Sequence, residues 1–117
     1  MSVAVRNAII EALGAIPNVN QREHSKVFSV QKPAWELLYA GRIRNGNRYR
    51  SVFNVVIWGG PDHVPNAHQI LQLAVERVTD ALWPVDCVLL GDVTADVQIP
   101  GLSELRFTHA MLRLEET

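Results

Sequence analysis

The sequence predicts an α+β fold, in which two helices pack on one face of a mainly antiparallel sheet of about four to five strands. Two segments repeat apolar residues at helical spacing, two alternating apolar runs flank a central turn, and two further strand-like runs follow the second helix. We expect a single domain over residues 1–117, because this length can bury one core and neither a linker nor a repeat divides it.

The first helix is expected near the N-terminus, where apolar residues recur at helical spacing and where Gly14 and Pro17 would close the helix. These residues are Val5, Ile9, Leu13 and Ile16. The polar stretch of residues 18–32 follows, and it predicts a short strand near Val19 and then a long loop.

Residues 35–58, WELLYAGRIRNGNRYRSVFNVVIW, read as a β-hairpin with a basic tip. Asn45 and Gly46 favour a two-residue type I′ turn, but that register would send the apolar residues of the two strands to opposite faces. We therefore expect a three-residue loop over residues 45–47, with Asn47 in the left-handed conformation. This register gathers six apolar residues on one face: Trp35, Leu37, Tyr39, Phe53, Val55 and Ile57.

The same register gathers the four arginines of the tip on the other face, with Arg44 opposite Arg48 and Arg42 opposite Arg50. Like charges facing each other are unfavourable in a free hairpin, so an acidic partner or a phosphate is expected there. A bulge at Gly41 would instead restore a two-residue turn and separate the arginines. The sequence leaves both registers open, and we favour the cluster.

Four apolar residues of the hairpin fall on its other face, beside Glu36 and Asn54. They are Leu38, Val52, Val56 and Trp58. Two short helices cover only one face of a sheet, so a second subunit is a natural cover for these side chains. The alternative is that they are scattered apolar residues on an ordinary surface.

The second helix is expected within residues 65–84, PNAHQILQLAVERVTDALWP, where Asn66 and Gln69 resemble a capping box and Pro84 ends the helix. Its apolar stripe consists of Ile70, Leu71, Ala74, Val78, Ala81 and Leu82. Two more strands are expected, one within residues 86–97 and one over residues 105–114, separated by the turn IPGLS.

Composition and spacing do not indicate an enzyme, a metal site or a cofactor. The net charge of −1 gives no general attraction to nucleic acid or to an anionic membrane, and no apolar run approaches the ~20 residues of a membrane span. Cys87 lies in an apolar run that is typical of a core residue. His63 and His68 are five positions apart, which is not the spacing of two metal ligands on one helical face.

Taken in order, these segments resemble the tail terminator family of long-tailed bacteriophages, most closely the small head-to-tail or minor tail proteins of actinobacterial phages. The resemblance covers nearly the whole chain, from the first helix through KPAWELLY, YRSVFNVVIWGG and HQILQLAVERVTDALW to the close VLLGDVTADVQIPGLSELRFTHAMLRLEE. It implies a structural virion protein that forms a hexameric ring on the finished tail tube, stops tube polymerisation and joins the tail to the head connector. Neither a reaction nor a cofactor is implied, and DNA would pass through the ring without specific binding.

In that ring, the subunit or tube interface is expected at Arg42, Arg44, Arg48 and Arg50, together with Leu38, Val52, Val56 and Trp58. The loop from Arg22 to Lys26 would make a second contact. The alternative function is a small nucleic-acid-binding α+β module that uses the same basic tip with Tyr39 and Tyr49.

Overall fold

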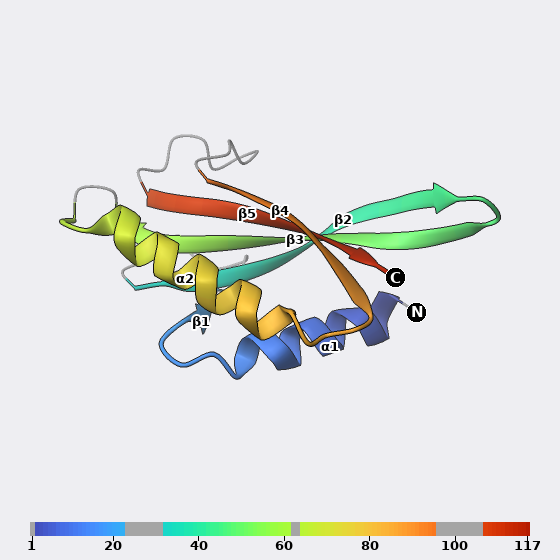
Figure 1. The fold of residues 1–117 in the computed structure, drawn as a ribbon, viewed down its shortest axis with the longest axis horizontal. Coiled ribbons are helices and arrows are strands. Elements are labelled where there is room, and N and C mark those ends of the chain that lie inside the picture. The colour runs from blue at the N-terminus through green and yellow to red at the C-terminus, as the bar shows by residue number, and fades with distance from the viewer. Residues whose placement is uncertain (1, 23–31, 62–63, 96–106) are drawn as a thin grey trace.

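The computed structural model describes residues 2–22, 32–61, 64–95 and 107–117, and these ranges confirm the α+β prediction (Figure 1). The two helices are α1 (Ser2–Gly14) and α2 (Ala67–Leu82). The strands are β1 (Asn20–Gln21), β2 (Ala34–Asn45), β3 (Arg48–Pro61), β4 (Val88–Ala95) and β5 (Phe107–Glu116). They form one sheet in the order β1-β2-β3-β5-β4, in which β1 and β2 are parallel and the other neighbours are antiparallel.

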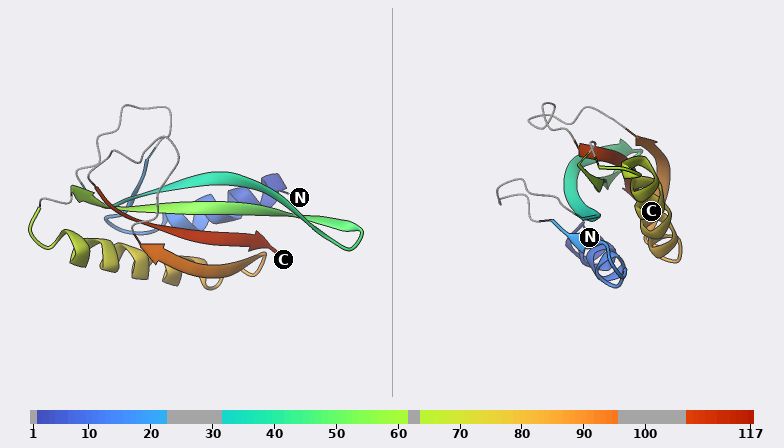
Figure 2. Two further views of the ribbon diagram at one scale, coloured as in Figure 1. Left: turned by 90° about the horizontal axis from the view of Figure 1, so that it is seen from above. Right: turned by 90° about the vertical axis from the view of Figure 1, so that its left-hand side faces the viewer.

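The main core lies between the helices and one face of the sheet, and Figure 2 shows both helices on that side. Helix α1 contributes Val5, Ile9 and Leu13 to this core, as their spacing predicts. Helix α2 contributes Leu71, Ala74, Val78 and Leu82. The sheet contributes Trp35, Phe53, Val55 and Ile57 from β2 and β3, and Ala110, Leu112 and Leu114 from β5.

The start of α2 differs from the predicted capping box. Asn66 precedes the helix in the left-handed conformation, with φ 68°, and its side chain makes no capping hydrogen bond. A capping side chain normally requires an extended backbone at that position, so the left-handed turn replaces the cap. The other end of α2 is as expected, because the helix ends at Leu82, two residues before Pro84.

At its base the β2–β3 hairpin has the predicted register: Trp35 pairs with Ile57, Leu37 with Val55 and Tyr39 with Phe53. Trp35, Phe53, Val55 and Ile57 are core residues, and Leu37 packs against them. A slip of one residue would move all of these side chains to the other face, so burial fixes the register here.

Nearer the tip the favoured register is wrong, and the alternative with a bulge at Gly41 is correct. The register shifts between Tyr39 and Gly41, whose φ of 123° is open to glycine but strained for other residues. Arg42 therefore lies opposite Ser51, and Arg44 opposite Tyr49, rather than opposite Arg50 and Arg48.

The turn itself has two residues, but they are Gly46 and Asn47 rather than the Asn45 and Gly46 that the sequence favours, because Asn45 pairs with Arg48. Gly46 has a φ of 64°, and Asn47 does not have the positive φ expected for it. A glycine with positive φ at the first central position is typical of a type II′ turn, which matches the natural twist of a hairpin.

The far face of the sheet is more enclosed than the sequence indicates. Val52, Val56 and Trp58 point to that face as predicted, but each is at most 3% exposed within the single chain. Leu38 is half-buried, and with Phe107 and Met111 it packs against a second, smaller apolar cluster of Ala34, Val56 and Trp58. The expectation that this face needs a second subunit as cover is therefore wrong for Val52, Val56 and Trp58.

Two predicted features lie outside the described residues. Most of the long polar loop falls in residues 23–31, and the turn IPGLS falls in residues 99–103. His63 also lies outside them.

Candidate interaction surface

The end of the β2–β3 hairpin projects beyond the rest of the sheet, to the right in Figure 1. Strand β5 pairs with β3 only as far as Val52, which lies opposite Glu115. Residues 41–51 therefore form a ribbon of two strands that extends a molecule whose longest dimension is 48 Å. We call residues 41–51 the hairpin arm.

The bulge divides the arginines of the hairpin arm between its two faces. Side chains alternate along a strand, and directly paired residues share a face. Arg42, Arg44 and Tyr49 therefore lie on the face that continues the helix-covered side of the sheet. Ile43, Arg48 and Arg50 lie on the opposite face. The arm thus presents two different basic surfaces in place of the predicted single cluster.

The helix-side face is organised by contacts within the arm. The Arg42 guanidinium lies 4.6 Å from the centre of the Tyr49 ring, which is a cation–π contact. The Arg44 Nε donates a hydrogen bond of 3.1 Å to the carbonyl oxygen of Gly46. Tyr49 is still 54% exposed, and Arg42 and Arg44 are exposed too, so the ring and the two guanidinium groups remain accessible on this face.

The opposite face is partly neutralised at its base. Arg50 Nη2 lies 3.9 Å from Glu115 Oε2 of β5, and both side chains are about a quarter exposed. On the other side of β5, the backbone N–H of Ser51 donates a hydrogen bond of 3.3 Å to Glu116 Oε1. This hydrogen bond is the main reason why the pKa of Glu116 is lowered from its ordinary value. Both carboxylates are at the root of the arm, so its tip remains strongly basic.

The hairpin arm is strongly basic and has little packing of its own. It contains four arginines and no acidic residue. A two-stranded ribbon without a packed face is only marginally stable in water. Such a ribbon gains order when a neighbouring molecule supplies apolar cover and negative charge.

Arg22 occupies a different place from the predicted contact loop. Its Nη1 lies 2.7 Å from Glu36 Oε1, and the two side chains are 10% and 2% exposed. The guanidinium also lies 5.9 Å from the Trp58 ring, on the far face of the sheet. The second contact was predicted for residues 22–26, of which residues 23–26 lie outside the described residues, and Arg22 itself is held by Glu36 of the same chain. Sequence reasoning missed this ion pair, since no pattern links residues 14 positions apart across β1 and β2.

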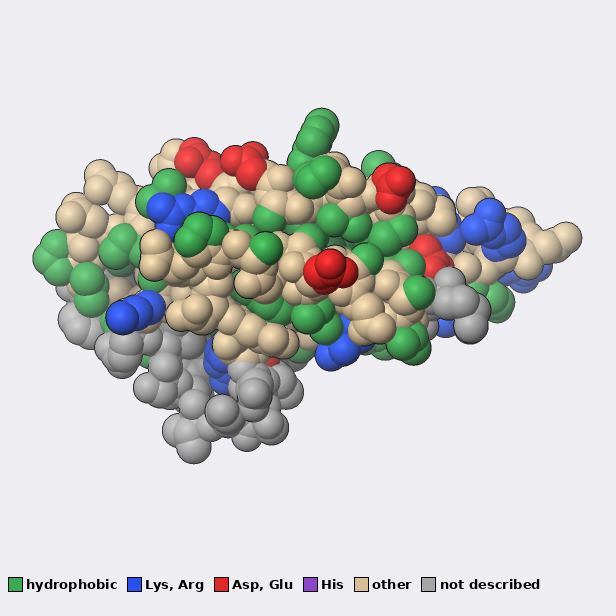
Figure 3. All heavy atoms as spheres, turned by 90° about the horizontal axis from the view of Figure 1, so that it is seen from below, with side chains coloured by type: hydrophobic (Ala, Val, Ile, Leu, Met, Phe, Trp, Pro, Cys, Tyr) green, Lys and Arg blue, Asp and Glu red, His purple; other side chains and the backbone are tan. Residues whose placement is uncertain are grey.

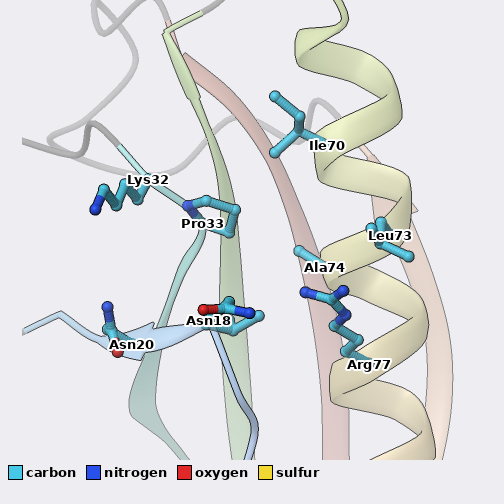
Figure 4. Close-up of a pocket in the computed structure, with 9 residues that line it drawn as sticks. Asn18, Asn20, Lys32, Pro33, Ile70, Leu73, Ala74 and Arg77 are labelled. Carbon is cyan, nitrogen blue, oxygen red and sulfur yellow. The ribbon is translucent and has the colours of Figure 1, made fainter.

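A hollow of about 400 Å³ lies between β1 and α2 (Figure 4). Asn18, Asn20, Lys32 and Pro33 line one side, and Leu73 and Arg77 of α2 line the other. Figure 4 shows the Arg77 side chain between α2 and Asn18. The lining lacks the paired carboxylate or histidine groups that acid–base catalysis uses.

Two further classes of site were sought in the described part of the chain. Across residues 2–22, 32–61, 64–95 and 107–117, histidine, cysteine and acidic side chains nowhere gather in threes as a metal ion would require. Neither of the described helices has the length and apolar character needed to cross a membrane.

None of the known protein families compared with this sequence matches it, and none of the curated proteins does either.

Proposed function

We propose that the protein is a tail terminator of a long-tailed bacteriophage, a structural virion protein that forms a hexameric ring at the head-proximal end of the tail tube. The ring stops tube polymerisation and joins the tail to the head connector. It assembles in the host cytoplasm and becomes part of the virion at the head-to-tail interface. The proposal rests on the resemblance in segment order. The hairpin arm is the structural observation that best supports it.

The hairpin arm suits a ring because it supplies one half of a head-to-tail contact. A closed ring needs two different surfaces on each subunit, one of which meets the other on the next copy. A ribbon with four arginines, held away from the body of the molecule, is a distinct surface of this kind. Electrostatic complementarity with an acidic neighbour would fix orientation and speed association.

The test of the proposal is the molar mass of the purified protein by light scattering, alone and with the tail tube protein encoded by the same genome. We expect a mass several times that of the 13.1 kDa chain, and rings at one end of the tubes by electron microscopy. A monomer in both settings would contradict the proposal. Changing Arg44 and Arg48 together to glutamate should weaken both ring formation and tail joining. If neither ring formation nor tail joining changes, the two arginines do not contribute to the interface.

A second candidate function is nucleic-acid binding by the hairpin arm. The observation that favours it is two exposed aromatic rings on the hairpin, Tyr49 in contact with the Arg42 guanidinium and Tyr39 near the base of the arm, because bases stack on such rings. The net charge of −1 disfavours it. Binding of single-stranded and duplex DNA should be titrated against salt, since phosphate-driven affinity falls steeply as salt rises. Absence of salt-sensitive binding would rule out this candidate.

A further inference from the structure

An apolar groove of about 520 Å³ runs between the ends of α1 and α2, on the helix layer of the molecule. Small and apolar side chains line it: Ala12, Ile16 and Pro17 on one side, and Ala81, Pro84 and Val85 on the other. Figure 3 looks onto this layer, with apolar side chains along it and lysine or arginine side chains on the narrow projection.

The surroundings of the groove are acidic. Asp80 lines it, and Glu11 and Asp86 are the chain neighbours of lining residues. All three are exposed, and Arg77 is the only basic side chain in the lining as described. Trp83 directly precedes Pro84 and is 80% exposed, a rare degree of exposure for tryptophan on a free surface. Exposed tryptophan and apolar lining together are typical of an interface centre.

We propose that this groove receives the hairpin arm of a second copy of the chain. The occupant follows from charge complementarity, because the arm carries four arginines and no acid, whereas the lining residues and their chain neighbours include the exposed acids Glu11, Asp80 and Asp86 against the single base Arg77. The arm is also the described segment that projects from the sheet with exposed aromatic surface at Tyr49. The proposal deepens the tail terminator proposal and rests on it for the ring.

The helix-side face of the arm is the one that fits. Tyr49 supplies the ring for the apolar floor of the groove, and Arg44, directly opposite Tyr49, supplies the charge for Asp80 of the next copy. Arg42, already held against the Tyr49 ring, reaches the same neighbour. Arg48 lies on the other face of the arm and makes no contact with the groove in this arrangement. The contact joins two different surfaces, so repeating it produces a head-to-tail ring.

A charge-reversal series tests the contact on the purified, full-length chain. Arg44→Glu and Asp80→Arg should each weaken self-association at least tenfold in sedimentation or light scattering. The double variant Arg44→Glu/Asp80→Arg should restore it, because both partners of the ion pair are exchanged. Arg48→Glu is the matched control, since it changes net charge equally on the other face and should weaken association much less.

Disulfide trapping provides a second measurement that does not depend on charge. In a Cys87→Ser background, Tyr49→Cys with Ala81→Cys should give a ladder of covalent oligomers under oxidation, whereas either cysteine alone should give at most dimers. Arg48→Cys with Ala81→Cys is the matched control and should give little product. Circular dichroism of each variant establishes that it is folded.

The inference is overturned if Arg44→Glu and Arg48→Glu weaken association equally, if the double variant stays dissociated, or if the Tyr49→Cys/Ala81→Cys chain still associates but no ladder forms. It is also overturned if the folded wild-type chain remains monomeric throughout the concentration series. Rings that form and cap tail tubes without the disulfide ladder would refute the groove contact and leave the tail terminator proposal standing. A ladder from a protein that never binds tail tubes would support the contact and refute the tail terminator.

Discussion

Gly59 lies where α2 crosses β3, and the close approach of the two backbones leaves no room for a side chain. A Cβ there would be 2.7 Å from Leu71 Cβ and 2.9 Å from Leu71 Cα, and it would clash with Thr108 Oγ1. We expect Gly59→Ala to lower the free energy of unfolding by about 3 kcal/mol, measured by urea titration, because α2 must move away from the sheet.

Gly14 provides the control for that substitution. It ends α1, and a Cβ there would have no neighbour within 4 Å. Gly14→Ala should leave the free energy of unfolding unchanged or raise it by about 0.5 kcal/mol. Equal losses of unfolding free energy in the two variants would show that the backbone freedom of glycine, rather than the close packing of α2 on β3, causes the loss in Gly59→Ala.

The Arg22–Glu36 pair is the second residue-scale feature with a measurable consequence. Both side chains are nearly buried, and removing one partner leaves a charge in a poorly hydrated position. We expect Arg22→Met or Glu36→Gln alone to cost about 3 kcal/mol in free energy of unfolding. The double variant should cost clearly less than the sum, as measured by a double-mutant cycle in urea. Strict additivity would mean that the two side chains act independently.

Among the elements, the hairpin arm depends on Gly41, whose φ of 123° produces the bulge. Gly41→Ala should destabilise the arm by about 1–3 kcal/mol, because this conformation is strained for any residue with a Cβ. Hydrogen exchange of the amides in residues 42–51 should accelerate, while exchange in α2 stays unchanged. Gly46→Asn is the control, since asparagine tolerates a φ near 64° and should cost much less. Acceleration throughout α2 would show that the arm is not an independent unit.

The hairpin also shows how far the sequence predicts the structure. At the base of the hairpin, alternation of apolar residues was sufficient to predict the strand register, because a slip of one residue would expose the buried side chains of Trp35 and Phe53. Beyond Tyr39 the side chains are exposed and burial no longer constrains the register, so one glycine decides it. The same limit applies to Asn66. The capping pattern there correctly predicted where the helix begins, but it did not predict the left-handed backbone conformation of Asn66.

At the scale of the whole molecule, cover of the far face could not be predicted from strand patterns. Alternation placed Val56 and Trp58 there, but only the folded chain brings Phe107 and Met111 of β5 against them. An apolar residue on a second face therefore does not by itself indicate a second subunit. Of the residues predicted for the interface, only the four arginines and half-buried Leu38 remain accessible. Among the described segments, the hairpin arm is therefore the main candidate for an interface.

Shortening the hairpin separates folding from assembly. Replacing residues 42–51 by Asn-Gly would join Gly41 to Val52, which are paired across the hairpin, through a short turn. The main core would keep its side chains, since none of its residues lies in the deleted segment, so we expect the free energy of unfolding to change by less than about 1 kcal/mol. Light scattering should then give a monomer at concentrations where the intact chain assembles. A shortened chain that still assembles would place the intersubunit contact elsewhere on the molecule, whereas a shortened chain that unfolds would show that the arm stabilises its own subunit.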